Sequence, residues 1–239
     1  DLAVKGKLDL FDAVVVSDVC LQIRHMSHIM RRNMGPTPFA YIQWPLEAKI
    51  DRWLGTTVDR LERFRLRLGS TLGVEIGDAA IRESIEVYNK NRALLRQLYQ
   101  LRTAKPGVIR AKEMVAAVMS SMVMPKEKNS GQIEQLIGEL DKAPTTDNGR
   151  VKLFLSGHLC QAVKPDILDL IEDLGGVVVG DDLFTGYRYI VSDADPTIEP
   201  LEALARRYLE LAMPCPSRSD PHQDWANYVV RESRASGAQ

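Results

Sequence analysis

The stretch from Val151 to Ile190 constrains the fold more than any other part of the chain. It reads VKLFLSGHLCQAVKPDILDLIEDLGGVVVGDDLFTGYRYI. A short apolar run, a turn, an amphipathic segment and a second apolar run follow one another. This order predicts a strand, a helix and a second strand, with Pro165 in the first helical turn and Gly175 at the helix end. Because strands joined through a helix pair in parallel, we expect a βαβ unit here.

The beginning of the chain predicts the same arrangement. FDAVVVSDVC contains a β-branched apolar run that suits a buried strand, LQIRHMSHIMRR starts a helix, and TPFAYIQWP forms a second strand closed by Pro45. A parallel sheet is again the expected product.

Between these units the sequence changes to a helical period. From Leu46 to Leu101, apolar residues recur every three or four positions, which predicts two helices. We expect the glycines Gly69, Gly73 and Gly77 to end the first helix and separate it from the second. The stretch DKAPTTDNGR reads as a linker before the strand pattern restarts. The predicted fold class is α/β, with two Rossmann- or flavodoxin-like parallel-sheet units joined by a helical segment. The boundaries are 1–48 for part of the first α/β unit, 49–143 for the helical segment and 144–239 for the second α/β unit.

Composition excludes some classes of protein. With 45% hydrophobic and 26% charged residues, the chain has the make-up of a globular protein, and its net charge of −1 gives no reason to expect nucleic acid or an anionic membrane as partner. No apolar run approaches the roughly 18 residues of a membrane span, and the start lacks the order of a secretory signal. We therefore expect a cytoplasmic protein. Because the first residue is not Met, we also expect residues to be missing upstream.

Three cysteines, Cys20, Cys160 and Cys215, are the candidate metal ligands. Cys20 and Cys160 follow predicted strands, where α/β sheets form their ligand sites, and Cys215 lies between two prolines after a helix. A disulfide framework is not expected from three scattered cysteines. The alternatives are buried small side chains or thiolates that meet at one metal centre. Zinc is disfavoured because paired short spacings are absent. The spacing permits an iron–sulfur cluster with one iron left for a non-protein ligand.

Other polar residues follow the strands of the second unit. Asp181 and Asp182 serve either turn chemistry or a functional role, and Arg188 either pairs with one of them or binds a phosphate. The candidate proton donors are His158, His25 and Asp182. Tyr187 and Arg188 either contact a substrate or a partner, or serve as a packed aromatic ring and an ion pair.

Five segments in this order resemble the benzoyl-CoA reductase/2-hydroxyacyl-CoA dehydratase family. They are LFDAVVVSDVC, IRESIEVYNKNRALLRQLYQLR, LFLSGHLCQAVKPDILDLIEDLGGVVVGDDLFTGYRYI, DPTIEPLEALARRYLE and MPCPSRSD. The resemblance runs over nearly the whole chain. The segment containing GDDLFTGYR is its most specific piece.

The resemblance implies an oxygen-sensitive subunit that binds a [4Fe-4S] cluster through cysteines. It implies two protein partners: a homologous second subunit and a separate ATP-hydrolysing iron–sulfur activator that delivers low-potential electrons. The implied substrate is an acyl-CoA, which is reduced through a ketyl radical anion, with either ring reduction or loss of water as the outcome. Cys20 and Cys215 match family cysteines. The third ligand is either Cys160 or a cysteine upstream of Asp1.

Within the family, the aromatic-ring reductase branch is the first hypothesis. The dehydratase branch often has a cysteine where this chain has Phe184, whereas SGHLCQAVKP and PCPSRSDPHQDW look more like the reductase branch. The alternatives are a 2-hydroxyacyl-CoA dehydratase subunit and a non-catalytic α/β binding or assembly protein. In either enzyme, Cys160 is expected as a cluster ligand first and as a pocket thiol second.

Overall fold

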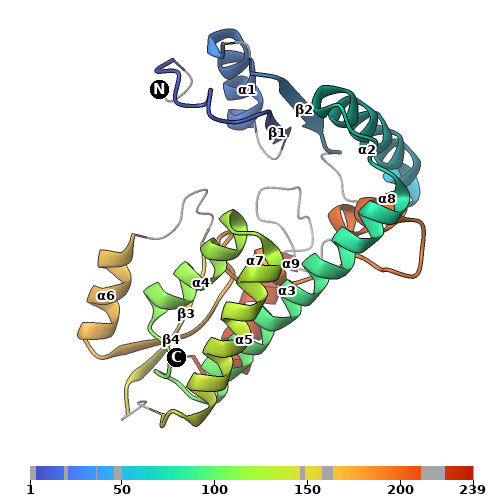
Figure 1. Cartoon of the computed structure of the whole chain (residues 1–239). Helices are drawn as coiled ribbons and strands as arrows, with labels where there is room; N and C mark the ends of the chain where they lie inside the picture. The colour runs from blue at the N-terminus through green and yellow to red at the C-terminus, as the bar shows by residue number, and fades with distance from the viewer. Residues whose placement is uncertain are drawn as a thin grey trace. The chain divides into compact units, whose positions relative to one another are not determined.

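A computed structural model of the chain describes residues 4–18, 21–35, 37–45, 50–145, 149–157, 164–210 and 224–238. These residues form two compact units, each with its own elements (Figure 1). Unit 1 comprises residues 1–83 and 195–210, and unit 2 comprises residues 84–194 and 211–239. The predicted boundaries at residues 48 and 143 stay a prediction.

Unit 1 is built on one parallel strand pair. Its elements are β1 (Val14–Asp18), α1 (Leu21–Asn33), β2 (Phe39–Gln43), α2 (Ile50–Leu72) and α8 (Pro200–Leu209). The expected parallel pairing of β1 and β2 is confirmed, with Val16 opposite Tyr41. Helix α2 packs against α8 and against β2. Arg60 and Arg67 of α2 donate to the carbonyls of Gln43 and Phe39, at 2.8 and 3.1 Å, so α2 holds both ends of β2.

The expectation that Gly69 breaks a helix is wrong. Helix α2 continues to Leu72, and Gly69 is buried inside it. A Cβ on Gly69 would lie 2.6 Å from the Val74 carbonyl oxygen, because the chain after the helix folds back on this position. The break itself follows Gly73, whose φ of +68° favours glycine.

Unit 2 joins a parallel strand pair to a helical core. Helix α3 (Asp78–Ala104) begins in unit 1 and continues through unit 2, and the other elements follow in chain order. They are α4 (Ala111–Val123), α5 (Lys126–Lys142), β3 (Val151–Leu155), α6 (Pro165–Asp173), β4 (Gly176–Asp181), α7 (Tyr187–Ile190) and α9 (Asp224–Ala235). The predicted βαβ unit is confirmed: β3 and β4 are parallel, Pro165 stands in the first turn of α6, and Gly175 has a φ of +94°. The described sheets have two strands each, so a Rossmann-like arrangement stays a prediction.

Strand β4 is buried along its whole length. All six of its residues are buried, and a register shift leaves Val179 without a partner on β3. Helix α3 covers the irregularity, since Arg102 Nε donates to the Val178 carbonyl at 2.7 Å and Thr103 Oγ1 donates to the Val179 carbonyl at 3.1 Å. Val178 packs with Leu168 of α6 and Ala111 of α4, while a separate core cluster consists mainly of apolar residues from α3, α4, α5 and α7. Two buried carbonyls of this strand are therefore satisfied by side chains of α3.

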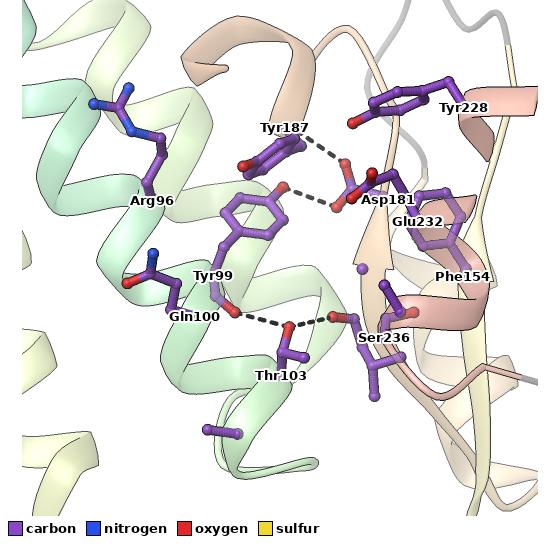
Figure 2. A pocket seen from close by; sticks show the side chains of 14 residues that line it. Arg96, Tyr99, Gln100, Thr103, Phe154, Asp181, Tyr187, Tyr228, Glu232 and Ser236 are labelled. Atoms are coloured by element: carbon purple, nitrogen blue, oxygen red, sulfur yellow. Dashed lines mark hydrogen bonds between the residues drawn. The ribbon is translucent and has the colours of Figure 1, made fainter. Parts of the chain in front are cut away.

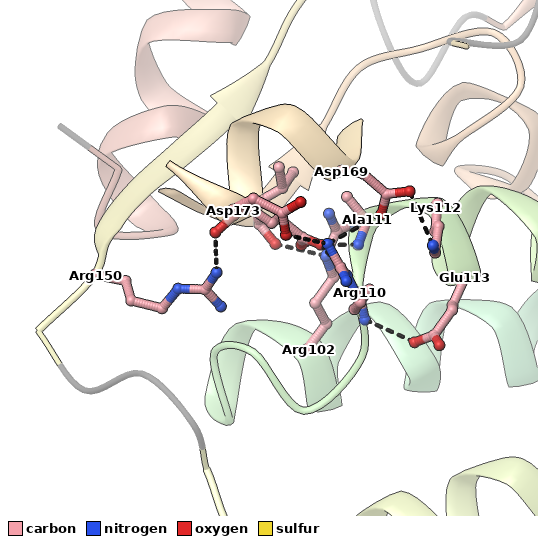
Figure 3. Close-up of polar contacts among 10 residues, drawn as sticks. Arg102, Arg110, Ala111, Lys112, Glu113, Arg150, Asp169 and Asp173 are labelled. Carbon is pink, nitrogen blue, oxygen red and sulfur yellow. Dashed lines mark hydrogen bonds and ion pairs between the residues drawn. The ribbon is translucent and has the colours of Figure 1, made fainter. Parts of the chain in front are cut away.

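An ion-pair network joins α6 to the start of α4 (Figure 3). The buried Glu172 accepts a hydrogen bond from the Ala111 amide at 2.9 Å and one from Arg110 Nε at 3.0 Å. Arg110 also pairs with Asp173 at 3.0 Å. Because Glu172 satisfies a free amide at the helix N-terminus, the network fixes α4 against α6.

Candidate functional site

The carboxyl ends of β3 and β4 meet at one edge of unit 2. The register places Leu155, the last residue of β3, opposite Asp181, the last residue of β4. Loops and helix starts converge at such an edge in α/β proteins, and ligands bind there. The two aspartates at this edge have separate sets of partners.

Asp181 is buried beside α3 and organises the turn that follows β4. Its Oδ2 accepts a hydrogen bond from the Tyr99 hydroxyl at 2.8 Å, and Arg102 lies 3.5 Å away. Its Oδ1 accepts hydrogen bonds from the amides of Leu183 and Tyr187, at 3.2 and 3.0 Å. The Arg102 and Asp181 side chains are only 2% and 3% exposed, so the pair is shielded from solvent. Asp181 therefore performs the turn chemistry that was one of its two expected roles.

Asp182 is buried on the other side of the turn. Its Oδ2 accepts hydrogen bonds from Arg188 at 3.1 Å and from Trp225 Nε1 at 2.8 Å, while its Oδ1 accepts one from the Gly157 amide at 3.2 Å. The Arg188 and Asp182 side chains are 7% and 1% exposed. The expected pairing of Arg188 with one of the two aspartates is confirmed. The catalytic role of Asp182 and the substrate-binding role of Arg188 stay predictions.

A cavity of about 380 Å³ lies beside Asp181 (Figure 2). Tyr99 of α3 and Tyr187 of α7 line one side, where their rings meet edge to face with centroids 5.1 Å apart. Tyr228 of α9 and Phe154 of β3 also line it. The cavity is rich in aromatic rings and phenol hydroxyls, and Asp181 forms part of its wall.

The phenols of this cavity are held in their protonated form. Burial, followed by the charge of Asp181, raises the pKa of Tyr99 well above its usual range. Burial is also the main cause that raises the pKa of Tyr187 and that of Tyr228. At neutral pH the three side chains are hydrogen-bond donors or packing groups, and they do not act as phenolate bases.

Neither α9 nor the cavity was predicted from the sequence. The segment DWANYVVRESRA, at Asp224–Ala235, carries apolar residues at helical intervals, so its periodicity was the signal that would have found the helix. The cavity had no such signal, because its walls come from residues as far apart as Tyr99 and Tyr228.

Several predicted site residues lie outside the described residues. They are Cys20, His158, Cys160 and Cys215. The side chain of His25 is exposed on α1. Within the described ranges, no three His, Cys, Asp or Glu side chains come together as a set that could hold a metal ion. None of the described helices is long and apolar enough to cross a membrane.

Comparison with known proteins gives matches along the whole chain. The sequence model of the family described as "2-hydroxyglutaryl-CoA dehydratase, D-component" matches residues 1–239. A benzoyl-CoA reductase subunit of Thauera aromatica is 21% identical over 240 residues, and lactoyl-CoA dehydratase subunit beta of Anaerotignum propionicum is 26% identical over 239 residues. Each alignment covers 100% of this chain and 62% of the relative.

A third relative is the (R)-2-hydroxyglutaryl-CoA dehydratase subunit beta of Acidaminococcus fermentans, which is 26% identical over 210 residues. That alignment covers 87% of this chain and 55% of the relative. The chain thus spans between about half and two thirds of the length of these curated relatives.

Proposed function

The chain belongs to the 2-hydroxyglutaryl-CoA dehydratase D-component family, and from this membership we propose that it is part of a subunit of an enzyme that acts on acyl-CoA thioesters. The observation that carries the proposal is the family match over all 239 residues. The names of the relatives support it, since they are subunits of a benzoyl-CoA reductase and of 2-hydroxyacyl-CoA dehydratases.

The proposed reaction is the reduction of an aromatic acyl-CoA by low-potential electrons. Motifs of the segments around Cys160 and Cys215 favour this branch. The alternative is dehydration of a 2-hydroxyacyl-CoA, because two of the relatives are dehydratase beta subunits. Identities of 21% to the reductase subunit and 26% to these two do not decide between the reactions, so a direct assay must.

The proposed cofactor is a [4Fe-4S] cluster held by Cys20, Cys160 and Cys215. Thiolates are the donors that such clusters require, and three cysteines leave one iron for a non-protein ligand. The donor chemistry fits the group. When bound, the cluster would supply single electrons of low potential.

The described residues of unit 2 have a supporting part in the proposal. Protonated phenols beside Asp181 would donate hydrogen bonds and exclude water on one side of the sheet. His158 is the proposed proton donor and Tyr187 the proposed substrate contact. The catalytic role of Asp182 and the substrate contact of Arg188 stay predictions, because both side chains are buried in contact with each other. We further propose that each parallel strand pair belongs to a larger Rossmann- or flavodoxin-like sheet.

The proposed partners are a homologous second subunit, a separate ATP-hydrolysing iron–sulfur activator and the acyl-CoA itself. The relatives are named as subunits, which agrees with a multi-subunit enzyme. A cytoplasmic location stays a prediction.

The test begins with the complete protein that contains this chain, purified without oxygen together with its partner subunit. Iron, acid-labile sulfide and the EPR spectrum after reduction are measured for the wild type and for serine variants of Cys20, Cys160 and Cys215. We expect a four-iron signal that each ligand variant weakens or loses, while Ser156→Ala, a matched control near Cys160, keeps it. A signal that survives in Cys160→Ser would move the third ligand elsewhere in the protein.

The same preparation separates the two reactions. With an electron donor and the activator, benzoyl-CoA and a 2-hydroxyacyl-CoA are offered in parallel and the products are identified. Ring reduction supports the first proposal, and an enoyl-CoA supports the alternative. Protein without iron and without either product would leave a non-catalytic binding or assembly role.

A further inference from the structure

We propose that Asp182 is a positioning residue that fixes the first turn of α9 to the carboxyl ends of β3 and β4. Together with Gly157, Arg188 and Trp225 it forms a buried contact set, here called the Asp182 clamp. Each of the three partners comes from a different part of unit 2: the loop after β3, helix α7 and helix α9.

The clamp joins residues that are far apart in the sequence. Gly157 and Trp225 are 25 and 43 positions from Asp182, and both donate to its carboxylate. Oδ1 accepts the hydrogen bond from the Gly157 amide, and Oδ2 accepts the one from Trp225 Nε1 of α9. The carboxylate is therefore a direct link between the loop after β3 and α9.

The backbone of Asp182 is fixed as firmly as its side chain. Its amide donates to the Leu155 carbonyl at 3.0 Å, which extends the contact between the two strands by one residue. Arg188 Nε donates to the Asp182 carbonyl at 2.7 Å, and another nitrogen of the same guanidinium pairs with the carboxylate. Arg188 thus holds both the main chain and the side chain in place.

Burial and charge favour positioning over direct catalysis. The Asp182 side chain is 1% exposed, and each of its oxygens accepts a hydrogen bond. In the described part of unit 2, the cavity is lined by Asp181 and not by Asp182. A charge this deeply buried is costly unless it is fully paired, so the set is stable only as a whole.

The clamp has a consequence for the two stretches that carry Cys160 and Cys215. Residues 158–163 follow Gly157 directly, and residues 211–223 end directly before α9. The described residues beside these stretches, Gly157 and Trp225, are therefore both held by Asp182. The relevance of this anchoring to a cluster rests on the proposed function, whereas the clamp itself does not.

The first measurement follows the indole N–H of Trp225 by NMR in the complete protein labelled with ¹⁵N-tryptophan. Trp225→Phe assigns its signal among those of the other tryptophans. In Asp182→Ala we expect exchange of this proton with water to accelerate by about tenfold or more, the range that corresponds to losing a hydrogen bond to a charged group. Asp182→Asn keeps an acceptor oxygen and should fall between the wild type and Asp182→Ala.

The matched control is Asp181→Asn. This neighbour is similarly buried, but the hydrogen-bond partners described above lie in α3 and in the turn after β4 rather than in α9. Because this change also breaks the buried pair with Arg102, both variants are compared under conditions in which unit 2 stays folded. The Trp225 exchange rate should then stay within about twofold of the wild type, since this link to α9 is intact. If Asp182→Ala does not fold, the Trp225 exchange rates of Asp182→Asn and Asp181→Asn are compared instead, and a faster rate in Asp182→Asn supports the proposal. Equal exchange rates in the wild type and in a folded Asp182 variant would overturn the proposal.

The second measurement is the rate of iron loss to a chelator in the same variants. If Cys160 and Cys215 hold a cluster, we expect faster iron loss in Asp182→Asn than in Asp181→Asn. Wild-type protein without iron would defeat the proposed function, and the indole result would still decide the clamp. A wild type that holds iron, with no change in indole exchange in Asp182→Asn, would defeat the clamp alone.

Discussion

The two parallel strand pairs share the same local order of strand, helix and strand, but they differ in how their strands are buried. In unit 2, Val177, Val178 and Val179 of β4 are at most 1% exposed. In unit 1, Val15 of β1 is 44% exposed, and four of the five residues of β2 are only partly buried. The same βαβ pattern therefore accompanies two different degrees of burial.

The arginines that bind the two sheets differ in the same way. Arg67 of α2 donates to a carbonyl of β2 near the surface, whereas Arg102 of α3 donates to a carbonyl of β4 in the interior and pairs with Asp181. The buried charge of Arg102 is stable only because Asp181 pairs with it. The difference indicates that unit 2 depends on its polar contacts more strongly than unit 1 does.

The largest expected effect comes from breaking the buried pair. Arg102→Met leaves the Asp181 carboxylate in the interior without its cationic partner, and we expect a loss of about 3–5 kcal/mol in the free energy of unfolding of unit 2. Arg67→Met in unit 1 removes an exposed hydrogen bond and should cost about 1 kcal/mol or less. Urea unfolding measures both, with Trp225 reporting on unit 2 and with Trp44 and Trp53 reporting on unit 1. Equal losses would refute the distinction between the units.

A smaller effect is expected from trimming one strand in each unit. Val177→Ala removes a fully buried side chain from β4 and should destabilise unit 2 by about 1.5–3 kcal/mol. Val15→Ala removes a half-exposed side chain from β1 and should cost less than half as much. The same unfolding assay checks the ratio, and a larger loss for Val15→Ala would reverse the comparison.

Adding a methyl group at one glycine in each unit should change stability in opposite directions. A Cβ on Gly176 of β4 would lie 2.8 Å from the Ile171 carbonyl oxygen, so Gly176→Ala should destabilise unit 2 by about 1–3 kcal/mol. A Cβ on Gly55 in α2 would meet open space. Gly55→Ala should therefore stabilise unit 1 by about 0.5–1 kcal/mol, which thermal or urea unfolding resolves. Destabilisation by Gly55→Ala would show a contact on α2 that the geometry does not contain.

The smallest effect is expected from alkaline pH. Burial raises the pKa of Tyr228 in the folded protein, so the unfolded chain loses this proton first as pH rises. The contribution is fully present below the unfolded-state pKa of about 10, and it is lost as pH rises from there toward the folded-state value. Urea midpoints measured across this range should fall less steeply in Tyr228→Phe. A steeper fall in the variant would contradict the assignment.

The local elements were predictable because their signals are local. Pro165 and Gly175 set the limits of α6 through their own backbone preferences, and the β-branched run at Val14 marks β1. The helix break predicted at Gly69 is wrong because the role of this glycine depends on a contact outside its own helix. A glycine reads as a break unless the close approach of the Val74 backbone, which no local pattern contains, is known.

The site was predictable as a position and not as a set of contacts. Asp181 and Asp182 were expected at the end of a strand, and they lie there. Their partners were not foreseeable, because Tyr99 and Trp225 reach them from 82 and 43 positions away. Adjacent aspartates face different neighbours, and only the packing of α3 and α9 assigns the neighbours.

The sequence by itself determined the strands, most of the helices, the parallel pairing and the family resemblance, since these depend on residue preferences and motif order along the chain. Only the tertiary structure decided which aspartate pairs with Arg102 and which with Arg188, how deeply β4 is buried, and where a cavity opens between α3 and α9. The physical reason is that burial and pairing depend on distances in space between residues remote in sequence, whereas periodicity records only which residues follow one another.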